Sequence, residues 1–79
     1  MTAHTVTVRI ENAYGDGHES ERTVTVLAPT GDLETWWEDT VWPETGDGHG
    51  VAGMGSCYTA TVIAAHDPAL VGRSREWVG

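Results

Sequence analysis

Residues 4–10 read His-Thr-Val-Thr-Val-Arg-Ile, and residues 22–27 read Arg-Thr-Val-Thr-Val-Leu. In both stretches valine or isoleucine alternates with threonine or arginine, which is the two-residue period of a strand with one buried face. Threonine suits the exposed face, because its branched side chain fits the pleat while its hydroxyl stays in water. Between the stretches lies an acidic segment, residues 11–21, that contains an Asp-Gly turn signal. We therefore predict an antiparallel hairpin over residues 4–27, with this segment as its long acidic tip.

A short amphipathic helix is predicted over residues 32–42. Its apolar residues fall on one helical face; they are Leu33, Trp36, Trp37 and Val41. Asp32 is placed to cap the first turn, and Pro43 ends the helix. An isolated helix of this length is only marginally stable in water, so we expect its tryptophan face to pack on the sheet.

Two further strands follow a glycine-rich loop. Residues 45–56 contain five glycines, too many for a regular element, and are predicted to be that loop. Residues 57–65 alternate as a strand and are apolar on both faces near their end, which indicates a central position in the sheet. One face of this strand carries Tyr58, Ala60, Val62 and Ala64. After an Asp-Pro turn, residues 73–78 are predicted to form a last short strand with Trp77 pointing inward.

The elements predict a single α+β domain over residues 1–79, in the order β-β-α-β-β. A right-handed crossover from the second strand through the helix would lay the third strand parallel to a strand of the hairpin. We therefore expect a small mixed β-sheet with one helix packed on one face, similar in element order to a β-grasp domain. That similarity concerns the order of elements only and implies no function.

The charge balance argues against some classes of partner. Twelve carboxylates against four arginines, with no lysine, give a formal net charge of −8 over 79 residues. A chain this acidic is repelled by nucleic-acid phosphates and anionic lipid, so we expect no direct binding to nucleic acid or membranes. Its field favours a protein partner with a basic surface, and a homo-oligomer is left open. The sequence shows no membrane span and no leader-like segment, so a cytoplasmic location is expected.

The tetrapeptide Gly-Asp-Gly-His occurs twice, at residues 15–18 and 46–49. Zinc and similar metals accept carboxylate and imidazole ligands, and a thiolate could complete the set. The candidate metal ligands are Asp16, His18, Asp47, His49 and Cys57. Asp-Gly is also a frequent turn dipeptide, because glycine reaches positive φ and aspartate accepts hydrogen bonds from its own turn. We favour the interpretation as turns and expect no metal and no other cofactor.

Cys57 is the one thiol of the chain. With a histidine and an aspartate it would complete a nucleophile–base–orienter arrangement. A lone intracellular cysteine is more often a small buried apolar residue, and a domain of this size has little room to enclose a substrate. The sequence therefore favours a protein that is not an enzyme.

The tryptophans and carboxylates together indicate a recognition surface. Partly exposed tryptophan among acidic side chains has the composition of a protein-binding hot spot. The predicted protein-binding residues are Trp36, Trp42, Glu38 and Asp39. The alternative is that a chain without phenylalanine uses tryptophan as its large core residue.

A second hypothesis is DNA mimicry, in which spaced carboxylates imitate phosphates and block a nucleic-acid-binding protein. Two acidic clusters are candidates. The hairpin cluster holds Glu11, Asp16, Glu19 and Glu21, and the helix cluster holds Asp32, Glu34, Glu38 and Asp39. An acidic surface that only keeps the protein soluble would have the same composition, because net charge alone does not specify a mechanism.

Three segments carry a resemblance to a known group of proteins. They are the Thr-Gly-Asp-Gly-His-Gly loop at residues 45–50, the Gly-Ser-Cys-Tyr strand entry at residues 55–58, and the Asp-Pro-Ala-Leu-Val-Gly turn at residues 67–72 with the Glu-Trp pair beyond it. Over residues 30–79 the chain looks like small uncharacterised accessory proteins of phages that infect actinobacteria. The resemblance implies action on a host or phage macromolecule in the host cytoplasm, and it carries no catalytic residue over. The sequence thus predicts a non-enzymatic, phage-encoded accessory protein that binds a host or phage protein.

Overall fold

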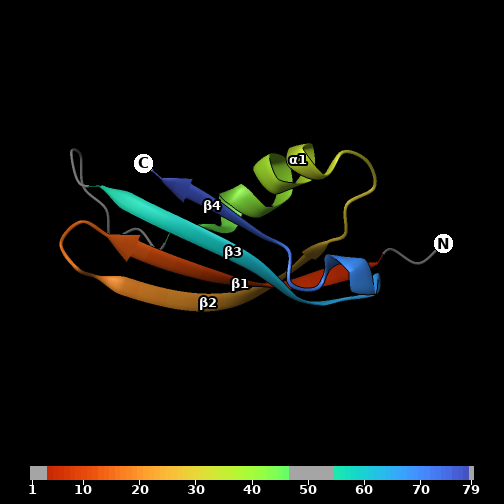
Figure 1. Cartoon of the computed structure of the whole chain (residues 1–79), viewed down its shortest axis with the longest axis horizontal. Helices are drawn as coiled ribbons and strands as arrows, with labels where there is room; N and C mark the ends of the chain where they lie inside the picture. Colours follow the sequence, from red (N-terminus) through yellow and green to blue (C-terminus); the bar gives the residue numbers. More distant parts are fainter. Residues whose placement is uncertain (1–3, 47–54, 79) are drawn as a thin grey trace.

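A hairpin forms one half of the sheet in the computed structural model, which describes residues 4–46 and 55–78 (Figure 1). Strand β1 (Thr5–Tyr14) pairs antiparallel with β2 (Glu19–Leu27) along its length. Valine residues of both strands face the same side, and the threonines between them face the other. The structure therefore has the hairpin that the alternating pattern predicts.

The tip of this hairpin is shorter than we expected. Most of the acidic segment belongs to the two strands, and the turn between them spans only residues 15–18. The alternation continues to the end of β1, because Asn12 and Tyr14 are buried while Glu11 is exposed. The prediction of a long tip is wrong because polar residues can also belong to strands. Composition alone does not show which residues pair through their backbones.

The remaining elements follow in the expected sequence. They are α1 (Leu33–Trp36), the π-helical turn η1 (Trp37–Val41), the 3-10 turn η2 (Trp42–Glu44), β3 (Ser56–Ala65), the 3-10 turn η3 (Pro68–Leu70) and β4 (Ser74–Val78). The predicted α+β class and the order β-β-α-β-β are confirmed.

The pairing of the strands differs from the expected mixed sheet. The sheet has the order β2-β1-β3-β4, and its three described pairings are all antiparallel. The helical connection does return β3 in the direction of β2, but β1 lies between these two strands and pairs antiparallel with both. The expected mixed sheet is therefore wrong. Alternation in a sequence gives the buried face of a strand but does not say which strand lies beside it.

The helical segment covers one face of the sheet and leaves the other open (Figure 1). The core lies between these two layers and contains Val6, Val8, Ile10, Trp36, Trp37, Val41, Ala60 and Val62. Burial of a valine- or isoleucine-sized side chain contributes about 1.5–3 kcal/mol to stability. The helix is short, so this packing rather than intrinsic helix propensity holds it in place.

Both neighbouring tryptophans of the helix are buried. Trp36 is 6% exposed and Trp37 is 4% exposed, and their ring centroids lie 4.8 Å apart. Neighbouring residues of an α-helix diverge by about 100° around the axis. Here the chain passes into a π turn, in which the Trp42 N–H donates to the Trp37 carbonyl. The π turn begins at Trp37, directly after Trp36, and both indoles belong to the core.

The first helical turn begins at the predicted cap. The carboxylate of Asp32 accepts hydrogen bonds from the backbone N and the hydroxyl of Thr35, each at 3.0 Å. Pro43 lies in the 3-10 turn that ends the helical segment. At these two positions the local chemistry of the sequence decides the backbone.

Strand β3 is central, as expected, but a bulge changes its far end. Val62 lies opposite Val8, whereas Ala64 lies opposite Thr7, so Ile63 is an extra residue in β3. The extra residue moves the Ala64 side chain to the open face. The prediction that Ala64 shares a face with Val62 is therefore wrong, since strict alternation holds only up to the bulge.

The buried Trp36 indole gives a direct test of this core. Its Nε1–H donates to the carbonyl of Leu27 at 2.7 Å, which ties the helix to the end of β2. In Trp36→Phe the ring loses volume and the Leu27 carbonyl loses its donor, so we expect a loss of about 2–4 kcal/mol. Urea unfolding followed by circular dichroism measures it.

Trp42→Phe is the matched control, because Trp42 is 48% exposed and lies in the same helical segment. Its effect should stay within about 0.5 kcal/mol. Equal stability of the Trp36→Phe variant and the native chain would contradict the proposed role of the indole.

Candidate protein-binding surface

The first Gly-Asp-Gly-His segment is the turn of the hairpin. Asp16 Oδ1 accepts a hydrogen bond from the backbone N of His18 at 3.0 Å. Gly17 has φ +92° and donates its N–H to the Tyr14 carbonyl at 3.0 Å. An L side chain rarely adopts this conformation, so the glycine and the aspartate are needed for the turn itself.

The second Gly-Asp-Gly-His segment begins beside this turn. The backbone N of Gly46 donates to Asn12 Oδ1 at 2.8 Å, and Asn12 is a buried polar residue of β1. Gly55 accepts a hydrogen bond from the Gly15 backbone N at 2.7 Å. The end of the hairpin thus holds the described flanks of the glycine-rich segment, a proximity that the sequence did not require.

The candidate metal ligands divide into two groups. Asp47 and His49 lie outside the described residues. Asp16 and His18 belong to the hairpin turn, and Cys57 lies opposite Ala13 in the β1–β3 pairing. Over residues 4–46 and 55–78, no three histidine, cysteine or acidic side chains come together as a metal-binding group.

Cys57 is half-buried at the start of β3. Burial raises the pKa of its thiol, and the neighbouring Glu76 carboxylate raises it further by repelling a thiolate and by accepting a hydrogen bond from the thiol. A nucleophilic cysteine requires the opposite, a thiolate stabilised by positive charge. The surroundings of Cys57 do not activate it as a nucleophile.

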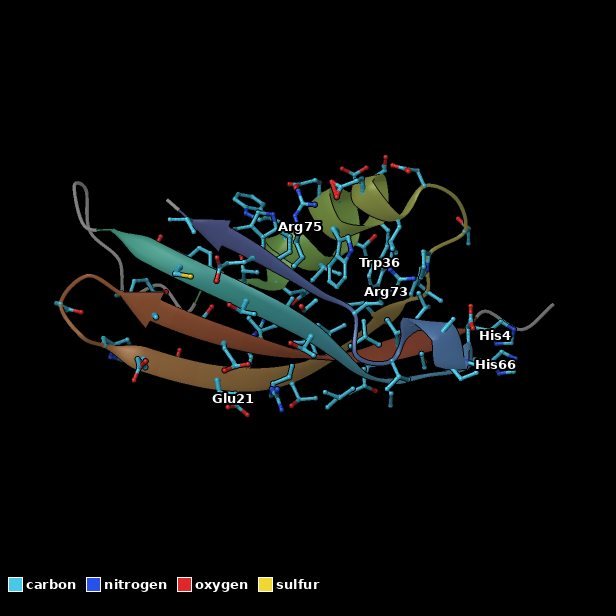
Figure 2. The ribbon with its side chains drawn as sticks, in the orientation of Figure 1. His4, Glu21, Trp36, His66, Arg73 and Arg75 are labelled. Carbon is cyan, nitrogen blue, oxygen red and sulfur yellow. The ribbon has the colours of Figure 1, made fainter. Side chains whose placement is uncertain are left out.

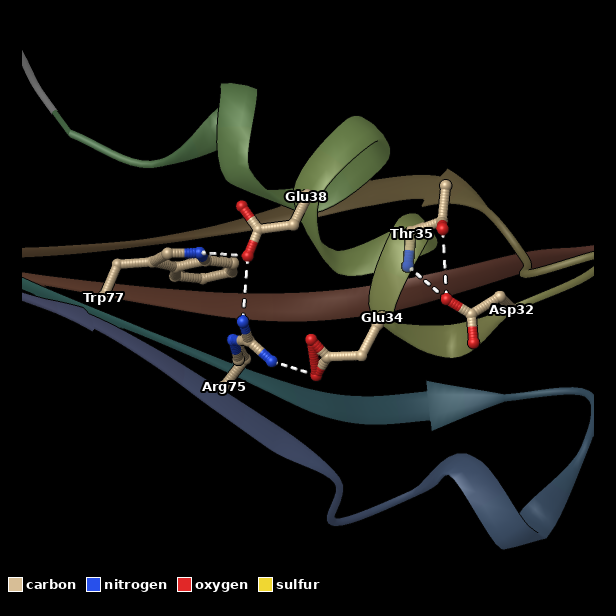
Figure 3. A network of polar contacts seen from close by, with 6 residues as sticks. All are labelled: Asp32, Glu34, Thr35, Glu38, Arg75 and Trp77. Carbon is tan, nitrogen blue, oxygen red and sulfur yellow. Dashed lines mark hydrogen bonds and ion pairs between the residues drawn. The ribbon is translucent and has the colours of Figure 1, made fainter.

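The acidic helix face is joined to β4 by a network of polar contacts (Figure 3). Arg75 pairs with Glu34, and its Nη2 lies 2.9 Å from Glu38 Oε1. The same Glu38 oxygen accepts a hydrogen bond from Trp77 Nε1 at 3.2 Å. These side chains are partly exposed, so each pair contributes little, about 0–1 kcal/mol, and their main effect is to fix the position of Glu38.

The four tryptophans occupy different environments. Trp36 and Trp37 belong to the core, and Trp77 is half-buried beside Trp37, with ring centroids 6.3 Å apart. Trp42 is 48% exposed. Among the predicted binding residues, Trp42, Glu38 and Asp39 are therefore exposed, whereas Trp36 is a core residue. We do not retain Trp36 as a contact residue, because the one polar atom of its side chain, Nε1, donates a hydrogen bond to the Leu27 carbonyl.

The turn that carries Trp42 is fixed on both sides. The Trp42 carbonyl accepts hydrogen bonds from Thr45, from the hydroxyl at 2.6 Å and from the backbone N at 3.0 Å. Arg22 of β2 donates to both the carbonyl and the carboxylate of Glu44, each at 2.8 Å. The exposed indole therefore sits on an ordered backbone, close in sequence to the exposed carboxylates of Glu38 and Asp39. We call Glu38, Asp39 and Trp42 the Trp42 surface.

A second acidic surface lies on the open face of the sheet. Glu21 is directly opposite Glu11, which is opposite Thr59, which is opposite Glu76. This row crosses all four strands and borders a hollow of about 500 Å³ that Cys57 also lines. The sequence contains these carboxylates, but only the register of the sheet brings them into one line.

Sequence reasoning missed a pair of stacked imidazoles at the opposite end of the molecule. The rings of His4 and His66 lie 4.0 Å apart between centroids and are nearly parallel, at 6° (Figure 2). His66 directly follows Ala65, which lies opposite Val6 beyond the bulge in β3. No motif in the sequence signals that pairing.

Comparison of the chain with protein-family models, with characterised proteins and with solved structures finds no match. None of the described helices is both long and apolar enough to cross a membrane.

The environment of Cys57 predicts slow alkylation with a measurable pH dependence. A raised pKa leaves less thiolate at a given pH, so iodoacetamide should react more slowly than with N-acetylcysteine. In Glu76→Gln the repulsion between Glu76 and the thiolate is removed, so the pKa should fall and the rate profile should move to lower pH. Mass spectrometry of timed samples between pH 7 and 10, a range chosen to bracket the ordinary thiol pKa, measures the rates.

Asp39→Asn is the matched control, because it removes one exposed carboxylate on the helical segment. Its profile should coincide with that of the native chain. Identical profiles for Glu76→Gln and the native chain would contradict the role assigned to Glu76.

Proposed function

We propose that this protein is a non-enzymatic binding protein that recognises another protein through the Trp42 surface. The observation that carries the proposal is the half-exposed Trp42 indole on a backbone turn held by Thr45 and Arg22. An aromatic side chain on a fixed backbone has only two side-chain torsions to order on binding, which is typical of interface anchors.

Charge supports a basic partner. Glu38 and Asp39 are exposed and precede Trp42 by about one helical turn, and the whole chain carries a formal net charge of −8. Acidic groups around an aromatic anchor increase the rate of encounter with a basic surface and exclude acidic ones. The proposed partner therefore presents an apolar pocket for an indole with arginine or lysine at its rim.

DNA mimicry is less well supported by the arrangement of the carboxylates. The side chains of Glu11 and Glu21 lie on the open face, whereas Glu34 and Glu38 lie on the helix that covers the other face and are paired with Arg75. A DNA mimic needs its negative charges along one continuous surface. We therefore keep the protein-binding interpretation, with phage origin as a hypothesis that rests on the sequence resemblance.

The proposal is tested by comparing Trp42→Ala with Val71→Ala. Both residues are 48% exposed, and Val71 lies outside the Trp42 surface. Tagged native protein and both variants are used to capture proteins from an actinobacterial lysate, and captured proteins are identified by mass spectrometry. We expect a protein that binds the native chain and Val71→Ala but is reduced at least tenfold with Trp42→Ala, a change of about 1.4 kcal/mol.

Thermal melting distinguishes a lost contact from a lost fold. Trp42→Ala should retain the native midpoint within a few degrees, since an exposed side chain contributes little to stability. Equal capture by all three proteins would reject the Trp42 surface, and a large fall in the midpoint would show that Trp42 acts in the core.

A further inference from the structure

The outer edge of β2 is a free hydrogen-bonding edge. Within the described residues, β2 is the first strand of the sheet and pairs only with β1. Tyr14 N donates to the His18 carbonyl at one end of the hairpin, and Ala28 N donates to the His4 carbonyl at the other. Because bonded and non-bonded pairs alternate in an antiparallel ladder, the even-numbered residues of β2 direct their N–H and C=O groups at β1.

The odd-numbered residues of β2 therefore direct their backbone groups away from the sheet. These residues are Glu19, Glu21, Thr23, Thr25 and Leu27, and all five are exposed. The Leu27 carbonyl confirms the direction, because it accepts the Trp36 Nε1–H from outside the β1–β2 ladder. That bond occupies the outward-facing carbonyl of Leu27. The edge available to another strand therefore runs from Glu19 to Thr25.

From Thr23 to Thr25 this edge lacks the usual devices that prevent strand addition. Proteins blunt edge strands with charged side chains, proline or a bulge. Strand β2 contains no proline, its register with β1 runs without a shift, and its charged residues are confined to Glu19, Glu21 and Arg22. Its sequence from residue 23 to 26 is Thr-Val-Thr-Val, which suits pairing with another extended chain.

The carboxylates at this edge favour a basic occupant. The Glu21 side chain lies at the edge of the open face (Figure 2), directly opposite Glu11 in the β1–β2 pairing. Like charges directly opposite each other in a sheet are destabilising. Arg9 contacts Glu11 at 3.3 Å, so this cation pairs with the inner carboxylate. A lysine or arginine on an added strand would lie opposite Glu21 and reduce the repulsion.

A second copy of this chain would not supply that cation. Arg22 is the one basic residue of β2, and its side chain lies on the other face, where it binds Glu44 at 2.8 Å. Two copies also repel each other, because each carries a formal net charge of −8. The charge of the edge thus favours a different, basic chain.

We propose that the β2 edge from Glu19 to Thr25 binds an extended basic segment of a partner protein as a fifth strand, with lysine or arginine opposite Glu21. Backbone hydrogen bonds provide the affinity, and the alternate side chains provide the specificity. This site uses other residues than the Trp42 surface, so each proposal stands or fails separately.

A synthetic peptide tests the edge directly. The probe Val-Thr-Val-Thr-Gln-Lys-Ser-Lys is designed to pair antiparallel with residues 26 to 19, with its lysines opposite Glu21 and Glu19. Titration into isotope-labelled protein, followed by amide resonances and amide hydrogen exchange, measures binding and its location. We expect added protection at Glu21, Thr23 and Thr25, with the even-numbered amides of β2 already protected in the free protein. The peptide with both lysines replaced by glutamate should bind at least tenfold more weakly.

Two variants of Thr25 test the role of its outward-facing backbone N–H. Thr25→Pro removes an edge donor without removing a β1–β2 hydrogen bond, because proline is tolerated in edge strands where its nitrogen faces solvent. Thr25→Val changes the same side chain and keeps the donor. We expect Thr25→Val to bind the peptide like the native chain and Thr25→Pro to bind at least tenfold more weakly. Glu21→Lys, which keeps the backbone, should also weaken binding and serves if Thr25→Pro fails to fold.

Several outcomes would overturn the proposal. They are equal binding of the lysine and glutamate peptides, equal binding by the two Thr25 variants, amide changes located outside β2, and a dimer through this edge in sedimentation experiments. Trp42→Ala should bind the peptide normally, which separates this site from the proposed function.

Discussion

The packing of two adjacent indoles against a valine-rich sheet face is the constraint on which the structure depends. Trp36 and Trp37 are both buried over β1 and β3, and the chain adopts a π turn where they enter the core. A helical segment this short would not persist alone in water. The same packing leaves Trp42 at the end of the segment, outside the core. The exposure of Trp42, on which the proposed binding surface rests, is thus a consequence of how the helix docks.

The acidic residues separate into two surfaces on opposite faces of the molecule. On the helix face, Arg75 fixes Glu38 and Glu34 against β4. On the open face, Glu21 and Glu11 lie opposite each other, and Arg9 of β1 contacts Glu11. Each surface thus has one arginine for at least two carboxylates, so both keep a negative charge that attracts a basic partner.

The sequence determined the elements better than their arrangement. Alternation at Val6 and Val8, and the cap at Asp32, are local signals, and each acts within a few residues. The insertion of β1 between β2 and β3, and the extra residue at Ile63, depend on contacts between distant segments. For the candidate site, the sequence predicted that some tryptophans are exposed, but it did not show that Trp42 is exposed while Trp36 is buried. The sequence placed Trp36 and Trp37 on one apolar face, but that both are fully buried depends on how the helical segment docks on the sheet.

The central place of β1 has a consequence for synthesis of the chain. Its first neighbour, β2, follows after a four-residue turn, but its second neighbour is β3, which begins at Ser56. During synthesis on the ribosome, the side of β1 that pairs with β3 therefore stays unpaired while the helical connection is translated. During that interval a valine-rich strand has one backbone edge without strand partners. The acidic composition makes nascent chains repel one another over this period, which opposes their association before folding is complete.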